Sequence, residues 1–295
     1  MKIGLQEVAE FLGLSAEEVK QWSGKRFITS EQARQILKDF GFSFPQKIVS
    51  FQMLKGGVAK TTSAFNLGVR AAQYGAKVLF VDLDQQANLT FALGHSNEND
   101  PAWIDIVEKK ATVYQTIKKV DSHIDVIPSN LNNSVLDRVL LNSNRQWSMA
   151  VKRPLDQIRD NYDLIIIDTA PALSAVNTAV TVASDLVVLP VIPDRFSYLG
   201  LQKHLSELED LRSDFNLKFE TKILVTKFDQ REKASHEIME RCLSEFPSQM
   251  LKSFVRTNSE IKNTIATDKT IFQRQGAAKV DYDMVAREIL GGAHA

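Results

Sequence analysis

Nine consecutive residues decide the fold of this chain: Leu54-Lys55-Gly56-Gly57-Val58-Ala59-Lys60-Thr61-Thr62. An apolar, β-branched run (48–51) precedes them, and a helical pattern of apolar residues (64–72) follows them. A strand, a tight glycine turn and a helix form the arrangement in which backbone N–H groups and a helix N-terminus hold phosphates. In such a loop Lys60 would reach the β- and γ-phosphates of a nucleotide, and the Thr61 hydroxyl would bind a magnesium ion.

The segment departs from the strict P-loop pattern, because Leu54 and Ala59 stand where that pattern has glycine, and it carries an extra lysine, Lys55. The run Lys-Gly-Gly-Val-x-Lys-Thr-Thr resembles the deviant Walker A motif of the ParA/MinD ATPases. This resemblance implies ATP and Mg²⁺ as cofactors and a homodimer in which the early lysine contacts the partner subunit's ATP. The predicted nucleotide-binding residues of the loop are Lys55, Gly56, Gly57, Val58, Ala59, Lys60, Thr61 and Thr62. The alternative is an ordinary strand–glycine–helix turn with two chance lysines.

Two carboxylates end the next apolar run, Val78-Leu-Phe-Val-Asp82-Leu-Asp84, which is followed by Gln-Gln-Ala-Asn-Leu-Thr. Because residues alternate along a strand, Asp82 and Asp84 share one side. The run resembles the family's second strand, and the resemblance implies that Asp84 orients or deprotonates the attacking water. Asp82 is then expected to act around the magnesium ion, one layer beyond its direct ligands. An acidic pair at a strand end can also be a solvated turn.

A third strand ends in Asp168, within Asp163-Leu-Ile-Ile-Ile-Asp-Thr-Ala-Pro171. It resembles a Walker B strand, whose carboxylate holds a magnesium-bound water, although the family usually has Pro-Pro at 170–171. The predicted metal-site residues are Thr61, Asp82 and Asp168, and the predicted catalytic residues are Lys55, Lys60 and Asp84. Later motifs resemble the family more loosely and add Thr226, Phe228 and Asn258 to the predicted nucleotide site.

Two substitutions relative to the family affect the predicted active site. If the backbone at Ala59 has a positive φ, alanine there costs about 1 kcal/mol relative to glycine. Gln85 replaces a proline that would stiffen the segment carrying Asp84. We therefore expect a working but slow ATPase.

Strand-like and helical segments alternate from residue 47 onward, with strands expected near 47–53, 77–82, 123–128, 163–168, 186–191, 220–226 and 250–254. This alternation predicts an α/β fold, a mainly parallel sheet with helices on both faces. The chain has 295 residues, zero formal net charge and one cysteine, Cys242, so a disulfide framework is excluded. No apolar run approaches the roughly 20 residues that span a bilayer. We expect a cytoplasmic, nucleoid-associated protein without a membrane partner.

Residues 1–44 read as a separate, small all-α domain that resembles a helix-turn-helix, followed by the ParA-like domain at 45–295. The unit balances six basic against six acidic groups through residue 46. DNA affinity depends heavily on neutralising phosphates, so such a unit binds only if its cations face one way. Lys20, Lys25 and Arg26 cluster and are the predicted contacts to operator DNA. The alternative is a protein-docking or dimer-stabilising module.

A second basic segment lies at residues 249–280 and has a net charge of +4. Its position matches the region of the family whose paired patches bind DNA in the ATP dimer. Arg256, Lys262 and Arg274 are the predicted nonspecific DNA contacts. A charge run of this kind can also be a solvated face.

The leading interpretation is a partition ATPase that segregates a plasmid or chromosome together with a centromere-binding, ParB-like adaptor protein. Two alternatives remain open: a ParA-like ATPase that positions a protein cargo, and an ATP-switched transcriptional repressor. A membrane-surface ATPase like MinD is disfavoured, because the C-terminal helical pattern (279–290) lacks the excess of Lys and Arg that such anchors have.

Overall fold

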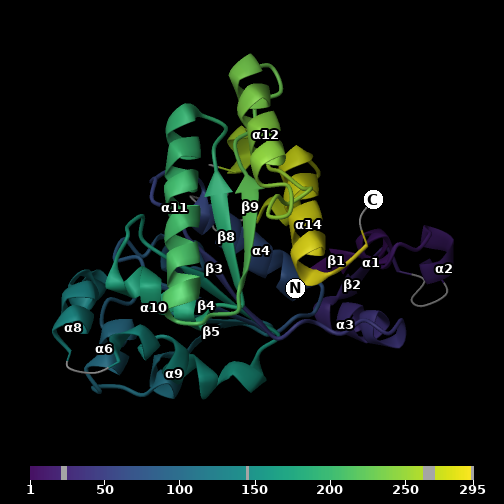
Figure 1. The fold of residues 1–295 in the computed structure, drawn as a ribbon. Coiled ribbons are helices and arrows are strands. Elements are labelled where there is room, and N and C mark those ends of the chain that lie inside the picture. The colour runs from purple at the N-terminus through teal and green to yellow at the C-terminus, as the bar shows by residue number, and fades with distance from the viewer. Residues whose placement is uncertain (21–24, 144–145, 262–269, 294–295) are drawn as a thin grey trace.

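The computed structural model describes residues 1–20, 25–143, 146–261 and 270–293. Its centre is a seven-stranded sheet with the strand order β5-β6-β4-β7-β3-β8-β9 (Figure 1). The strands are β3 (Lys47–Phe51), β4 (Val78–Asp82), β5 (Lys118–Asp121), β6 (Ile124–Ile127), β7 (Leu164–Asp168), β8 (Leu186–Val191) and β9 (Glu220–Val225). All neighbouring strands pair in parallel except β5 and β6, which form an antiparallel hairpin. The predicted mainly parallel α/β fold is confirmed.

One predicted strand is wrong and one strand was missed. Residues 250–254 form no strand, although Met250 makes an isolated bridge to Ile223 of β9. The Glu288 carboxylate accepts the N–H groups of Lys252 and Ser253, so these groups do not pair with β9. The seventh strand is instead β5, whose charged sequence Lys-Lys-Val-Asp has no apolar run to predict it.

Helices cover both faces of the sheet, as the continuous burial of the central strands β4, β7 and β8 requires. One face packs against α4 (Lys60–Gln73) and α14 (Ala277–Leu290). The other face packs against α6 (Trp103–Val107), α8 (Leu136–Asn142), α9 (Lys152–Asp156), α10 (Ala175–Ala183), α11 (Arg195–Asp214) and, beside β9, α12 (Lys233–Glu245). Two short helices, α5 (Asn88–Ala92) and α7 (Val113–Thr116), lie in the connections. None of the helices in the described part of the chain is long and apolar enough to cross a membrane.

The N-terminal unit contains strands as well as helices, so the prediction of an all-α unit is wrong. Strand β1 (Lys2–Gly4) pairs antiparallel with β2 (Phe27–Thr29), and the helices are α1 (Leu5–Leu12), α2 (Ala16–Lys20) and α3 (Ser30–Asp39). Residues 27–29 thus join the chain start in a small sheet. The division into domains at residue 44 stays a prediction.

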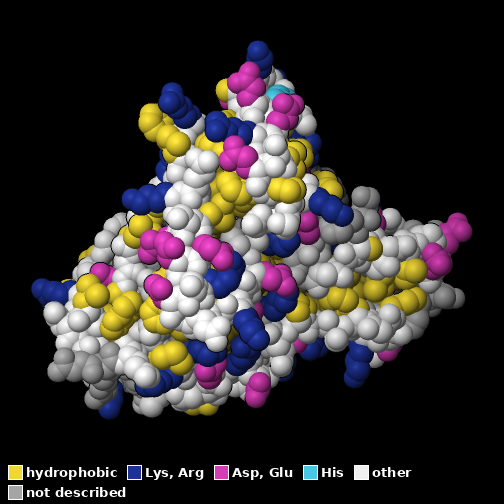
Figure 2. Space-filling model, viewed as in Figure 1, with side chains coloured by type: hydrophobic (Ala, Val, Ile, Leu, Met, Phe, Trp, Pro, Cys, Tyr) yellow, Lys and Arg dark blue, Asp and Glu magenta, His cyan; other side chains and the backbone are white. Residues whose placement is uncertain are grey.

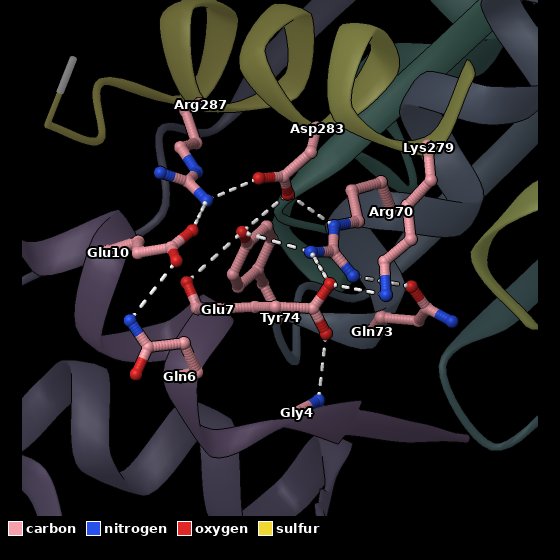
Figure 3. A network of polar contacts seen from close by, with 10 residues as sticks. All are labelled: Gly4, Gln6, Glu7, Glu10, Arg70, Gln73, Tyr74, Lys279, Asp283 and Arg287. Atoms are coloured by element: carbon pink, nitrogen blue, oxygen red, sulfur yellow. Dashed lines mark hydrogen bonds and ion pairs between the residues drawn. The ribbon is translucent and has the colours of Figure 1, made fainter. Parts of the chain in front are cut away.

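The N-terminal unit packs into the same hydrophobic core as α4 and α14. Phe11 of α1 is 1% exposed and its ring lies 4.5 Å from that of Tyr74. A polar network reinforces this packing (Figure 3): Arg70 of α4 binds Glu7 of α1 and Asp283 of α14. The unit is therefore attached to the main body by buried charges as well as by apolar contact.

Candidate nucleotide-binding site

The glycine-rich loop connects β3 to α4 and has two residues in the left-handed backbone region. Gly57 has φ 75°, and Ala59, which precedes the first residue of α4, has φ 68°. The positive φ that would make Ala59 unfavourable is therefore present. Two side chains from the end of β9 bind loop carbonyls: Thr226 Oγ1 donates to Val58 O at 3.0 Å, and Lys227 Nζ donates to Gly57 O at 2.6 Å. Both bonds fix the shape of the loop.

Lys60 begins α4 and is buried, with 7% of its surface exposed. Burial lowers its pKa, while the negative charges of Asp168 and Asp84 oppose this shift. The structure thus brings together the lysine and two of the predicted carboxylates. An ammonium group in so poorly hydrated a place attracts phosphate oxygens more strongly than it would in water.

Asp168 ends β7 between the two strands that carry the other predicted residues. Its backbone lies opposite Phe51 of β3 and opposite Asp82 of β4. Burial raises the pKa of Asp168, the charge of Asp82 raises it further, and the nearby Thr61 and Lys60 oppose the rise. Both carboxylate oxygens are buried and accept no hydrogen bond from the described residues.

A buried carboxylate without partners is costly unless a cation or donor compensates it. The Asp168 oxygens, with the Thr61 hydroxyl nearby, therefore fit a hydrated Mg²⁺, an ion that prefers oxygen ligands and retains several waters. Asp82 differs, because both of its oxygens are occupied: Oδ1 accepts the Asp84 N–H at 3.1 Å, and Oδ2 accepts the N–H and hydroxyl of Thr90. Asp82 can thus support a metal site without binding the ion itself.

Asp84 lies in a tight turn between β4 and α5 and is 8% exposed. Its Oδ1 accepts the Gln86 N–H at 3.0 Å, and its carbonyl accepts the Ala87 N–H at 2.9 Å. The following Ala87 has φ 54°, a second alanine in the left-handed region. Gln85, which stands in place of the family's proline, is exposed on this turn.

Lys55 reaches away from the loop toward the start of α11. Its Nζ lies 2.7 and 3.0 Å from the two carboxylate oxygens of Asp194. Asp194 also caps α11 by accepting the N–H of Ser197 at 2.8 Å. The Lys55 side chain is about one-third exposed, so it lies at the edge of the site while Lys60 lies inside.

The three later residues predicted for the nucleotide site, Thr226, Phe228 and Asn258, all make contacts within the chain. Phe228 is 6% exposed and packs edge-on against His236 and Phe254, with ring centroids 5.0 and 5.1 Å away. The Thr226 hydroxyl is occupied by the loop carbonyl described above. Asn258 Oδ1 accepts the Glu260 N–H at 2.8 Å. Their contact with a nucleotide stays a prediction.

The predicted DNA contacts differ in their exposure and in the contacts that they make. Arg256 forms a bidentate ion pair with the buried Asp281, its Nη2 lying 2.6 Å from Asp281 Oδ1, whereas Arg274 is exposed. Lys262 lies outside the described residues, as does the side chain of Lys20. Lys25 and Arg26 are exposed, and Arg26 lies over the Phe27 ring at 5.6 Å. Figure 2 shows basic and acidic side chains interspersed on the face that it displays.

Three residues near the site were not assigned a role from the sequence: Thr90, Asp194 and Lys227. Asp194 has a recognisable signal, because an aspartate directly before a helix is a preferred N-cap residue. Thr90 lies within the quoted Asp84 motif, but its link to Asp82 spans eight residues. Lys227 carries no sequence signal for its bond to the Gly57 carbonyl.

Comparison with known families matches residues 46–221 to a family model described as an AAA domain. An uncharacterised protein of Methanocaldococcus jannaschii is 31% identical over 246 residues, covering 80% of this chain and 91% of the relative. The sporulation initiation inhibitor protein Soj of Bacillus subtilis is 30% identical over 249 residues, covering 82% of this chain and 98% of Soj. The cell division protein PomZ of Myxococcus xanthus is 25% identical over 288 residues, covering 95% of this chain and 90% of PomZ.

Among solved structures, apo McdA of Cyanothece has the same fold, with a TM-score of 0.77 at 23% identity, covering 83% of this chain and 99% of McdA. The alignment with PomZ reaches into the N-terminal unit, whereas the alignments with Soj and McdA cover about four-fifths of the chain. The family match, the relatives and the assembled P-loop with Asp84 and Asp168 agree. The chain therefore belongs to the ParA family of partition ATPases, which hydrolyse ATP to ADP and phosphate.

Proposed function

We propose that this protein is an ATP-driven partition or positioning ATPase that dimerises around ATP, binds DNA nonspecifically as a dimer and releases it on hydrolysis. The observation that carries the proposal is the buried Asp168 carboxylate at the end of β7, whose oxygens accept no hydrogen bond from the described residues and lie near Thr61 and Lys60. ATP and Mg²⁺ are the cofactors of this ATPase. The cargo is a plasmid or chromosome, recruited through a centromere-binding, ParB-like adaptor.

Each residue then has a distinct role. The loop N–H groups and the Lys60 ammonium hold the phosphates, and Thr61 and Asp168 hold the magnesium ion directly or through water. When bound, the ion would neutralise charge that develops on the phosphate oxygens. Asp84 orients the attacking water and accepts its proton as the bond to the γ-phosphate forms and the bond to ADP breaks. Asp82 holds the Asp84 turn in place.

Lys55 is the residue that we expect to act on the ATP of a second subunit. Its position at the rim of the site and its partial exposure support a role across a dimer, where it would exchange the Asp194 carboxylate for the other subunit's ATP. Two large apolar side chains on the first turns of α11, Phe196 and Leu199, are 77% and 51% exposed beside this lysine. Figure 2 shows hydrophobic side chains exposed at the upper end of α11. Such a patch fits a face that becomes covered in the dimer.

The test uses the full chain with ATP, ADP or no nucleotide, followed by light scattering after gel filtration and by binding to a random-sequence DNA duplex. Asp84→Ala should accumulate as an ATP-bound dimer on DNA, because it binds ATP but does not turn it over. Lys55→Ala should bind ATP and remain a monomer without turnover. A monomeric Asp84→Ala protein that holds ATP would contradict the dimer mechanism.

A second candidate keeps the ATPase and replaces the DNA cargo with a protein assembly. PomZ, which aligns over 95% of this chain, is named a cell division protein, and this favours the second candidate. If the adaptor and DNA do not change the ATPase rate while a protein assembly does, the second candidate holds.

A further inference from the structure

Thr90, on the first turn of α5, is buried and bound to the carboxylate that supports the catalytic turn. It is 3% exposed. Its hydroxyl donates to Asp82 Oδ2 at 2.7 Å, and its N–H donates to the same oxygen at 2.9 Å. The hydroxyl oxygen also accepts the Ser129 N–H at 2.9 Å.

The bond to Ser129 sets the direction of the Thr90 hydroxyl proton. A hydroxyl has one proton to donate and two lone pairs to accept with. Because the Ser129 N–H can only donate, and the ionised Asp82 carboxylate can only accept, the proton points to Asp82. The backbone after β6 thus orients the hydroxyl, and the hydroxyl fixes the rotamer of Asp82.

Asp82 passes this constraint to Asp84. Its second oxygen accepts the Asp84 N–H at 3.1 Å, so the two oxygens of one carboxylate connect α5 to the catalytic turn. The turn needs such support, because it includes Ala87 at φ 54°. A non-glycine residue in the left-handed region persists only where the surroundings determine the backbone.

We propose that Thr90 is a positioning residue for ATP hydrolysis: through Asp82 it holds the turn that carries Asp84 in its reactive geometry. This inference rests on the proposed role of Asp84. Thr90 is expected to touch neither nucleotide nor water itself, so its loss should lower kcat and leave ATP affinity unchanged. A threonine that only fills space in the core would affect stability alone.

The experiment measures kcat, KM and the Kd for ATP of the full chain with Thr90→Val and Thr90→Ser. Valine keeps the shape and removes the hydroxyl, whereas serine keeps the hydroxyl and removes the methyl group. Thr116→Val is the matched control, because Thr116 is also fully buried and its hydroxyl donates only to the Val113 carbonyl of its own helix, at 2.7 Å. Thr90→Cys provides a weak donor of similar size.

We expect kcat to fall at least tenfold in Thr90→Val with an unchanged Kd, and to stay within about twofold of the wild type in Thr90→Ser and Thr116→Val. Equal kcat values in Thr90→Val and Thr116→Val would overturn the inference, as would equal losses in the valine and serine variants. If Thr90→Val does not fold, kcat of Thr90→Cys must lie well below that of Thr90→Ser. A wild-type chain that does not hydrolyse ATP would instead refute the proposed function.

Discussion

Replacing Glu7 with glutamine should destabilise the protein, because Glu7 is one of the acidic groups that compensate buried cations around α4 (Figure 3). The Arg70 guanidinium is 1% exposed, and its Nη2 lies 2.9 Å from Glu7 Oε1. The same carboxylate oxygen lies 2.8 Å from Lys279 Nζ, and Oε2 accepts the Gly4 N–H at 2.9 Å. Asp283, at 2.5 Å, remains as a partner of Arg70.

The magnitude follows from what the substitution leaves behind. The network holds three basic side chains (Arg70, Lys279, Arg287) and three acidic ones (Glu7, Glu10, Asp283). Removing one partner of a buried ion pair costs about 3 to 5 kcal/mol. Glutamine still offers one acceptor oxygen and Glu7 is partly exposed, so we expect a loss of about 2 to 3 kcal/mol in the free energy of unfolding.

The pH dependence gives a second readout. Burial alone would raise the pKa of Glu7, but Arg70, Lys279 and the Gly4 N–H together lower it below the ordinary value of 4.5. A lowered pKa in the folded state contributes stability that is present above pH 4.5 and is lost as the pH falls through the folded pKa. The difference between wild type and Glu7→Gln should therefore be full at pH 7 and shrink below pH 4.5.

Urea unfolding followed by circular dichroism measures both effects. Glu17→Gln is the control, since Glu17 lies exposed on α2 of the same N-terminal unit, and it should change the unfolding free energy by less than about 0.5 kcal/mol. If Glu7→Gln loses no more than Glu17→Gln at pH 7, the reasoning on the buried network is refuted. The same network means that deleting residues 1–44 exposes Arg70 and the core around Tyr74, so point substitutions are the sound way to test this unit.

The remaining predictions concern the site and the basic segment. Ala59→Gly should raise the free energy of unfolding in urea by about 1 kcal/mol, because it relieves the left-handed alanine; a loss would contradict the strain argument. Lys60→Ala should abolish ATP binding in calorimetry, and unchanged affinity would refute the assignment of the loop. Arg256→Ala should cost about 1 to 2 kcal/mol of stability, since the buried Asp281 loses the guanidinium and keeps the backbone N–H of residue 256. Arg274→Ala should leave stability unchanged and weaken binding to any DNA sequence, which filter binding at several salt concentrations measures.

The sequence predicted the parts of the structure that depend on local pattern. The sequence predicted the buried strands, the glycine turn and the carboxylates at strand ends. These features depend on the periodicity of side chains and on the residue types of a phosphate-binding loop, which are local properties of the sequence. The mainly parallel sheet and the proximity of Lys60, Asp84 and Asp168 followed from them. Strand β5 was missed because its own charged sequence has no apolar pattern, although its partner β6 was predicted. Segment 250–254 was predicted as a strand because the sequence gives no sign that Glu288, more than 30 residues away, binds its backbone.

The net charges counted along the sequence were its least informative feature, because such counts ignore ion pairs between segments that are distant in the sequence. The segment 249–280 counts as +4, yet Arg256 is bound to Asp281 and Lys279 to Glu7. The N-terminal unit counts as neutral, yet Glu7 and Glu10 are occupied by Arg70, Lys279 and Arg287 of the main body. Arg34 of the unit is likewise paired with Asp163 of the main body. With two acidic groups and one basic group neutralised in this way, the rest of the unit carries one more basic than acidic group. The neutral charge count for residues 1–46 alone argues against DNA binding by this unit. The pairing in the structure makes the count less decisive, so the exposed Lys25 and Arg26 remain predicted DNA contacts.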